Sequence, residues 1–245
     1  MRREGERSTE KIRLDKFLCD LGAGSRREAR ERIRAGRVRV DGRAVTAPET
    51  KLDPASALVT LDGERLVWAA HHYYMLNKPA GVLSATEDRA QRTVLDLLPP
   101  ELRRLGLFPV GRLDRDTRGL LLLTDDGDFA HRVISPKCAV EKRYYALVEG
   151  ELSGEDAAAF EKGLVLGDGT SCRPARLELL GGGACIVTLT EGKYHQVKRM
   201  LASRGAPVRE LKRLSIGALA LPEELAEGEL RELGEDDLCR VFMVR

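Results

Sequence analysis

The first regular pattern of hydrophobic positions begins at Leu14 and has the period of a helix. Its apolar residues recur at intervals of three and four: Leu14, Phe17, Leu18 and Leu21. This spacing predicts a short helix that buries one face and ends near the glycines at 22 and 24. Ser25 is followed three residues later by Glu28, which matches a capping box and predicts a second helix from Ser25 to Gly36.

Two strand pairs follow, each recognisable by alternating residues around an Asp-Gly pair. The segments are 38–45 and 59–66. Asp-Gly between alternating positions favours a tight hairpin, because both residues tolerate the positive φ that such turns require. Residues 12–68 are therefore predicted to form a small helix-helix-hairpin module. The charged segment before it, 1–11, has no apolar period and is expected to be a mobile tail.

Beyond a short linker, 69–72, the pattern indicates a second and larger domain over 73–245. Strands are predicted at 73–78, 120–124, 141–149 and 185–190, and helices at 153–163 and 195–204. These elements do not alternate as regular strand-helix-strand units. The fold class predicted for the chain is therefore α+β, with a mostly antiparallel mixed sheet in the second domain. The acidic segment 223–237 is expected to cover the outside of this domain.

Composition narrows the possible classes of protein. Hydrophobic residues make up 42% and charged residues 33% of the 245 positions, so the chain can bury a core and is not disordered throughout. The net charge is only +2, and any binding to a polyanion must come from local clusters of charge. The five cysteines are scattered without zinc-ligand spacing. With no long apolar run and no apolar signal segment, a cytoplasmic protein is expected, without membrane contact.

One such cluster of charge lies in the first module. Eight arginines and three acidic residues fall between positions 26 and 43. Five of the arginines have spacings that can form a stripe running along the second helix into the hairpin, and they are predicted to bind RNA phosphates: Arg26, Arg27, Arg30, Arg34 and Arg37. A solvated helix face would have the same composition, so this alternative stays open.

The segment Gly111–Gly119, with the sequence GRLDRDTRG, holds the strongest candidate chemistry. Asp114 and Asp116 are two residues apart and are surrounded by Arg112, Arg115 and Arg118. On an extended backbone the two carboxylates would point to opposite sides, so a cooperating pair as in glycoside hydrolases is not predicted. One aspartate would act, and Asp116→Asn is expected to keep most of the activity. A surface loop with ion pairs is the alternative.

Several segments resemble known families. The first module is similar to the S4 RNA-binding domain, and the segment 111–127 is very similar to the signature of pseudouridine synthases. Three further segments match the RsuA-type branch of these enzymes in order and spacing: 75–81, 141–144 and 191–200. The resemblance covers nearly the whole chain from residue 12. It implies isomerisation of a uridine in ribosomal RNA to pseudouridine, without cofactor or metal.

The resemblance also implies roles for single residues. Asp114 would be the catalytic carboxylate, as nucleophile or as proton-abstracting base, and these two roles stay open. Lys198 would pair with it, with Arg199 as the alternative for that role. Tyr144 would stack on the target base. The resemblance gives Arg112 the task of holding a uridine that has been displaced from its RNA stack.

Contacts to the RNA are also expected around the last of these motifs. The basic residues that would meet phosphates are Lys193, Lys198, Arg199, Arg204, Arg209, Lys212 and Arg213. The segment 192–200 is more similar to enzymes that act on small-subunit rRNA than to those acting on large-subunit rRNA. The expected partner is therefore small-subunit rRNA within a ribosomal assembly intermediate, bound by a monomer. The same reaction on large-subunit rRNA and a non-catalytic S4-type assembly factor remain as alternatives.

Overall fold

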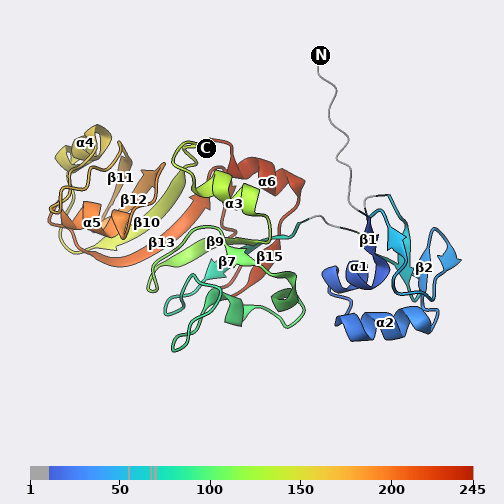
Figure 1. Ribbon diagram of the computed structural model, residues 1–245. Coiled ribbons are helices and arrows are strands. Elements are labelled where there is room, and N and C mark those ends of the chain that lie inside the picture. Colours follow the sequence, from blue (N-terminus) through green and yellow to red (C-terminus); the bar gives the residue numbers. More distant parts are fainter. Residues whose placement is uncertain (1–10, 55, 67, 69–70, 245) are drawn as a thin grey trace, which may run out of the picture. The chain divides into compact units, whose positions relative to one another are not determined.

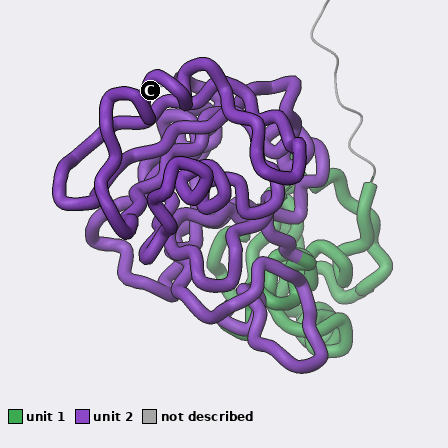
Figure 2. Tube along the Cα trace, turned by 90° about the vertical axis from the view of Figure 1, so that its left-hand side faces the viewer, with its two compact units in different colours: residues 1–71, 99–106 green, residues 72–98, 107–245 purple. Residues whose placement is uncertain are grey.

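The computed structural model describes residues 11–54, 56–66, 68 and 71–244. The chain forms two compact units, which Figure 2 shows in different colours: Met1–His71 with Pro99–Gly106, and His72–Leu98 with Leu107–Arg245. The predicted tail, apart from Lys11, and two residues of the predicted linker lie outside the described residues. The segment 99–106 belongs to the first unit, although its position in the sequence had placed it in the second domain.

The first unit contains both predicted helices and both predicted hairpins. Its elements are β1 (Ile12–Arg13), α1 (Leu14–Asp20), α2 (Arg26–Arg34), β2 (Val38–Val40), β3 (Arg43–Ala44), β4 (Lys51–Leu52), β5 (Val59–Leu61), β6 (Glu64–Leu66) and the 3-10 turn η2 (Leu102–Leu105). The capping box forms as predicted, because the backbone N–H of Ser25 donates to Glu28 Oε2 at 2.6 Å and the Ser25 hydroxyl accepts from the Glu28 N–H. Strands β3, β2, β5 and β6 make a four-stranded sheet in that order.

Each hairpin turns at its Asp-Gly pair. The φ angles are 50° at Asp41 and 80° at Gly42, and 55° at Asp62 and 91° at Gly63. Two consecutive positive φ angles are the conformation that twists a two-residue turn to match its strands. The strands and helices enclose a separate core that includes Leu14, Phe17, Leu18, Ile33, Val38 and Val59.

The second unit is built on one long mixed sheet (Figure 1). Its elements are β7 (Tyr73–Lys78), η1 (Val94–Leu97), β8 (Phe108–Pro109), β9 (Arg118–Thr124), α3 (Gly127–Ile134), β10 (Lys142–Val148), α4 (Gly154–Lys162), β11 (Arg176–Gly181), β12 (Ala184–Leu189), α5 (Gln196–Ala202), β13 (Val208–Ile216), β14 (Leu219–Ala220), β15 (Leu230–Glu232) and α6 (Glu235–Val241). The strand order is β11-β12-β10-β13-β9-β7-β15, with β14 beside β13 and β8 beside β9. Among the strand pairs of this sheet that the described residues form, only β9 with β13 is parallel, and the predicted α+β class is confirmed.

Several elements of this unit were not predicted from local patterns, among them β13, α3 and β15. Strand β13 lies between β10 and β9 in the centre of the sheet, although its run of charged residues hides the strand pattern. Helix α3 begins at a cap formed by Asp126, whose side chain accepts from the N–H of Phe129 at 3.0 Å. Within the acidic segment 223–237, Leu230–Glu232 forms β15 and extends the sheet beside β7, in addition to lying at the surface.

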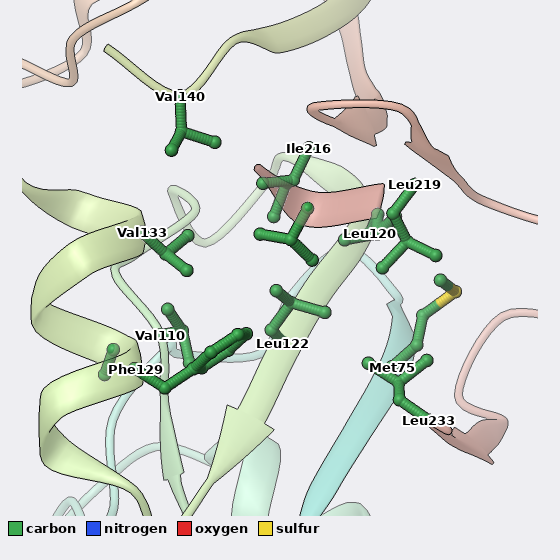
Figure 3. Packing of buried hydrophobic residues seen from close by; sticks show 12 residues of the cluster. Met75, Val110, Leu120, Leu122, Phe129, Val133, Val140, Ile216, Leu219 and Leu233 are labelled. Atoms are coloured by element: carbon green, nitrogen blue, oxygen red, sulfur yellow. The ribbon is translucent and has the colours of Figure 1, made fainter. Parts of the chain in front are cut away.

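The core of the second unit makes β9 a rigid support. Figure 3 shows Leu120 and Leu122 of β9 facing Phe129 and Val133 of α3, with Ile216 from β13 close by. All residues from 119 to 124 are buried, because the strand has neighbours on both sides and helices pack on it. In the described residues no helix is long and apolar enough to cross a membrane. The loop that enters β9 carries Asp114, so the core fixes one end of that loop.

Candidate active site

The backbone at Asp114 forms a tight turn and is not extended. The N–H of Thr117 donates to the carbonyl oxygen of Asp114 at 3.1 Å, which closes a four-residue turn. The turn brings both aspartates of the segment to the same side, since Lys198 Nζ lies 3.6 Å from Asp114 Oδ2 and 2.5 Å from Asp116 Oδ1. The prediction that the two carboxylates point to opposite sides is therefore wrong. Its premise was an extended chain, and a turn breaks the alternation of side chains. The expectation that Asp116→Asn keeps most of the activity rested on the same premise and no longer follows.

A buried lysine donates hydrogen bonds to the backbone of this turn. Lys78, at the end of β7, is fully buried, and its ammonium donates to the carbonyl oxygens of Pro79 at 2.9 Å, Arg115 at 3.2 Å and Thr117 at 2.9 Å. Burial lowers the pKa of Lys78 to about 8, and the nearby carboxylates of Asp116 and Asp114 oppose this shift. Lys78 lies in the segment 75–81 that carries the resemblance, but no role was predicted for it. The signal that could have found it is a single lysine ending a strand whose preceding residues are largely buried.

Two further contacts fix the backbone around the turn. Ser84 Oγ donates to the carbonyl oxygen of Leu113 at 2.9 Å and accepts from the N–H of Leu113 at 3.1 Å. On the other side Gly119 has a φ of +100°, and a Cβ there would lie 2.8 Å from the backbone nitrogen of Arg213. The close parallel pairing of β9 and β13 thus requires glycine at 119. Hydrogen bonds from Lys78 and Ser84 therefore fix the backbone of the turn that carries Asp114.

Helix α5 supplies the cationic partner. Gln196 at its start is buried, donates to Glu191 Oε1 at 2.8 Å and accepts from the N–H of Lys193 at 2.8 Å, which fixes how the chain enters the helix. Lys198 then faces Asp114. Arg199 instead pairs with Asp168 at 2.5 Å, so the geometry makes Lys198 the basic partner of Asp114 and does not give Arg199 that place.

An aromatic pair lies beside the carboxylate. His195 precedes α5 in a left-handed conformation, with φ of 48°, and its Nε2 lies 3.5 Å from Asp114 Oδ1. The ring of Tyr194 stacks on the His195 ring with centroids 3.8 Å apart, and Tyr194 is 75% exposed. Asp114 itself is 25% exposed at its side chain. A partly shielded carboxylate with a cation on one oxygen and an exposed aromatic ring nearby can bind and react with a nucleoside that enters from solvent.

Tyr144 lies on β10 and is buried. Its hydroxyl oxygen accepts from Arg213 Nη1 at 3.4 Å, and Arg213 Nε donates to the carbonyl oxygen of Leu120 at 2.7 Å. Among the described residues no hydrogen bond joins Tyr144 to Asp114, so the structure links Tyr144 to the site only through the neighbouring strands. Arg213 is 3% exposed, and the prediction that it meets RNA phosphates is wrong because its guanidinium is buried and donates to Leu120 and Tyr144 inside the protein.

The residues predicted to bind RNA differ in how free their charges are. Arg112, two residues before Asp114, is exposed, while the Lys193 ammonium contacts the carbonyl oxygen of Ser171 and lies 3.6 Å from Glu191 Oε2. In the first unit three of the five predicted arginines are in ion pairs, which are Arg27 with Glu31, Arg30 with Asp15 and Arg37 with Asp62. Within the described part of the chain, Arg26 and Arg34 are exposed and have no such pair.

A cavity of about 500 Å³ opens at another place on the sheet, beside Arg143 of β10. Its lining includes Arg176, Glu178 and Ser215. Asp114, Tyr144 and Lys198 do not line it, so this cavity is separate from the cluster around Asp114.

Comparisons with known proteins identify the family of this chain. Residues 72–203 match the model of the RNA pseudouridylate synthase family, and residues 12–65 match the S4 domain. The chain is 46% identical over 231 residues to an uncharacterized RNA pseudouridine synthase of Bacillus subtilis, which covers 93% of this chain and 97% of the relative. It is 41% identical to ribosomal small subunit pseudouridine synthase A of Escherichia coli, over 94% of this chain and all of the relative. A crystal structure of a pseudouridylate synthase matches with a TM-score of 0.66 and 36% identity, over 94% of this chain and 99% of that one.

Proposed function

The chain belongs to the RNA pseudouridylate synthase family, and on that premise we propose that it isomerises one uridine of small-subunit ribosomal RNA to pseudouridine. The match to this family identifies the chain as an isomerase, and a separate match identifies its S4 domain. The choice of the small subunit is supported by relatives that are named for that subunit and that this chain matches over their full length. Large-subunit rRNA is the competing substrate.

The observation that carries the proposal is the placement of Asp114. Its carboxylate is partly exposed, is held on a braced turn, and has the Lys198 ammonium at 3.6 Å. In the reaction the bond from ribose C1′ to N1 breaks, a new bond from C1′ to C5 forms, and one proton leaves C5 while another ends on N1. Asp114 acts on the ribose, either by attack at C1′ or by removal of a sugar proton. Either role needs the carboxylate in its ionised form.

The other residues of the site bind and position the nucleotide. A uridine inside folded RNA cannot reach Asp114, so it has to leave its stack, and the exposed Arg112, two residues before Asp114, supports the displaced conformation. Tyr144 provides an aromatic face for the detached base. Lys193 and Arg199, at the two ends of the motif that starts α5, contact phosphates of flanking nucleotides.

The S4 domain provides a second contact with the RNA. Arg26 and Arg34 are its most available phosphate contacts, with Arg27, Arg30 and Arg37 beside them in the same stripe. Two linked contacts raise the effective concentration of the catalytic unit at its target. This favours a folded ribosomal assembly intermediate in the cytoplasm over a short free RNA as substrate, and a monomer of this chain suffices to make both contacts.

Two experiments test the proposal. Asp114→Asn keeps the size of the side chain but removes the carboxylate, so it abolishes product while the fold and RNA affinity persist, whereas Asp128→Asn, at an exposed aspartate of α3, retains activity. Product formed by the Asp114→Asn variant at any pH contradicts the role of Asp114. Pseudouridines mapped in both rRNAs of cells lacking the protein identify the subunit. Loss of a large-subunit site alone would replace the substrate, and no loss with intact RNA binding would favour a non-catalytic assembly factor.

A further inference from the structure

The ammonium of Lys198 lies between two carboxylates but forms a hydrogen bond with only one. Nζ is 2.5 Å from Asp116 Oδ1, and it is 3.6 Å from Asp114 Oδ2, which is beyond hydrogen-bond length. The stronger contact is thus made with the aspartate that the signature does not use for catalysis. The hydrogen bond from Lys198 also lowers the pKa of Asp116 below its ordinary value.

We propose that Asp116 is a positioning residue, which holds Lys198 close enough to support the negative charge of Asp114 but too far to hydrogen-bond to it. This inference rests on the proposed function, because it assigns Asp114 as the reacting carboxylate. A hydrogen bond from Lys198 would occupy one oxygen of Asp114 and lower its readiness to react. With Asp116 as the acceptor, both Asp114 oxygens remain available to the ribose.

Distance affects the two interactions differently. A Coulomb attraction varies as the inverse of distance, so moving a cation from 2.8 to 3.6 Å weakens it by only about a fifth. A hydrogen bond is lost over the same interval. The observed separation from Asp114 therefore keeps most of the electrostatic support while leaving the carboxylate free of a direct donor.

Both sides of the contact are held by the fold. The carbonyl groups of Arg115 and Thr117, on either side of Asp116, accept hydrogen bonds from the buried Lys78. Lys198 stands on α5, whose residues Val197 and Met200 are buried. Asp116 is 73% exposed at its side chain, so its contact with Lys198 adds little to stability. The effect that this contact can still have is to fix the position of the Lys198 ammonium.

The first test compares single-turnover rates at saturating enzyme with rRNA substrate. In Asp116→Ala, Lys198 is released and closes on Asp114, and we expect the rate to fall about tenfold, which corresponds to about 1.4 kcal/mol, with little change in RNA affinity. Asp116→Glu keeps the charge and restores most of the rate. Asp168→Ala is the matched control, because it breaks the ion pair of Arg199, the next residue on α5, without touching Lys198. An unchanged rate in Asp116→Ala overturns the proposal.

The second test is a double-variant cycle. If Asp116 acts through Lys198, Asp116→Ala has no further effect on the rate in a Lys198→Gln background. Effects that multiply would show that Asp116 acts by another route, such as repulsion of RNA or folding of the turn, and would also overturn the proposal. Failure of the proposed function is seen separately, because it appears as activity in Asp114→Asn.

Discussion

Replacing Lys78 with methionine should show whether Lys78 supports the turn that carries Asp114 or only stabilises the unit as a whole. Methionine has a similar length and fills the buried site, but it cannot donate to the three carbonyl oxygens that the ammonium now binds. Two of these carbonyls belong to the turn that carries Asp114. Lys142 offers a matched control, since it is also buried and its ammonium donates to the carbonyl oxygens of Val133 and Val140, away from that turn.

The magnitude follows from the hydrogen bonds. Each bond from a charged donor is worth about 1.5–3 kcal/mol, and part of this sum is offset because the variant no longer buries a charge. A net loss of about 3 kcal/mol lowers the melting temperature of a unit of this size by roughly 6–12 °C. Release of the turn by about 1 Å would reduce the single-turnover rate by on the order of a hundredfold. Lys142→Met loses two bonds and should be destabilised without a comparable loss of rate.

The measurements are thermal unfolding by circular dichroism and single-turnover kinetics at pH 7, well below melting. The pKa of Lys78 is about 8 in the folded protein against 10.5 for a free lysine, so between these values unfolding takes up a proton at this side chain. Its contribution to stability therefore rises with pH over that window, and the stability difference between wild type and Lys78→Met should widen. If Lys78→Met melts within 2 °C of wild type, or loses stability but keeps its rate, Lys78 does not hold the turn that carries Asp114.

Three further outcomes can be checked. Gly119→Ala places a Cβ against the backbone of Arg213 at a φ of +100°, so the second unit should lose more than about 2 kcal/mol in denaturant unfolding, and equal midpoints would contradict this. Arg26→Gln with Arg34→Gln should weaken RNA binding and make its dependence on salt less steep at unchanged stability, whereas an unaltered salt slope would mean that these charges are only solvated. The Asp15 carboxylate accepts hydrogen bonds from Arg13 and Arg30, and these bonds lower its pKa to about 2. Its contribution to the free energy of unfolding is therefore present above about pH 4 and is lost as the pH falls toward 2. Asp15→Asn should remove this acid-dependent part of the unfolding curve.

Several local elements of this protein could be predicted from short stretches of sequence. The capping box at Ser25, the Asp-Gly turns and the strand Tyr73–Lys78 formed where the patterns predicted, because each depends on residues within a few positions of one another. The family resemblance likewise pointed to Asp114 and Lys198. Strand β13 could not be recognised in this way, since its burial comes from neighbours on both sides and not from its own alternation.

The assembly of the site, in contrast, depends on contacts between residues that are far apart in the sequence. Asp116 and Lys198 are 82 positions apart, and they meet because the parallel pairing of β9 with β13 sets the turn that carries Asp114 beside α5. The turn itself brought Asp116 to the side of Asp114, and the burial of Lys78 beneath it depends on strand β7. Contacts of this kind arise from strand pairing over long separations, and a local pattern of hydrophobic and polar residues holds no information about which distant side chains will share one space.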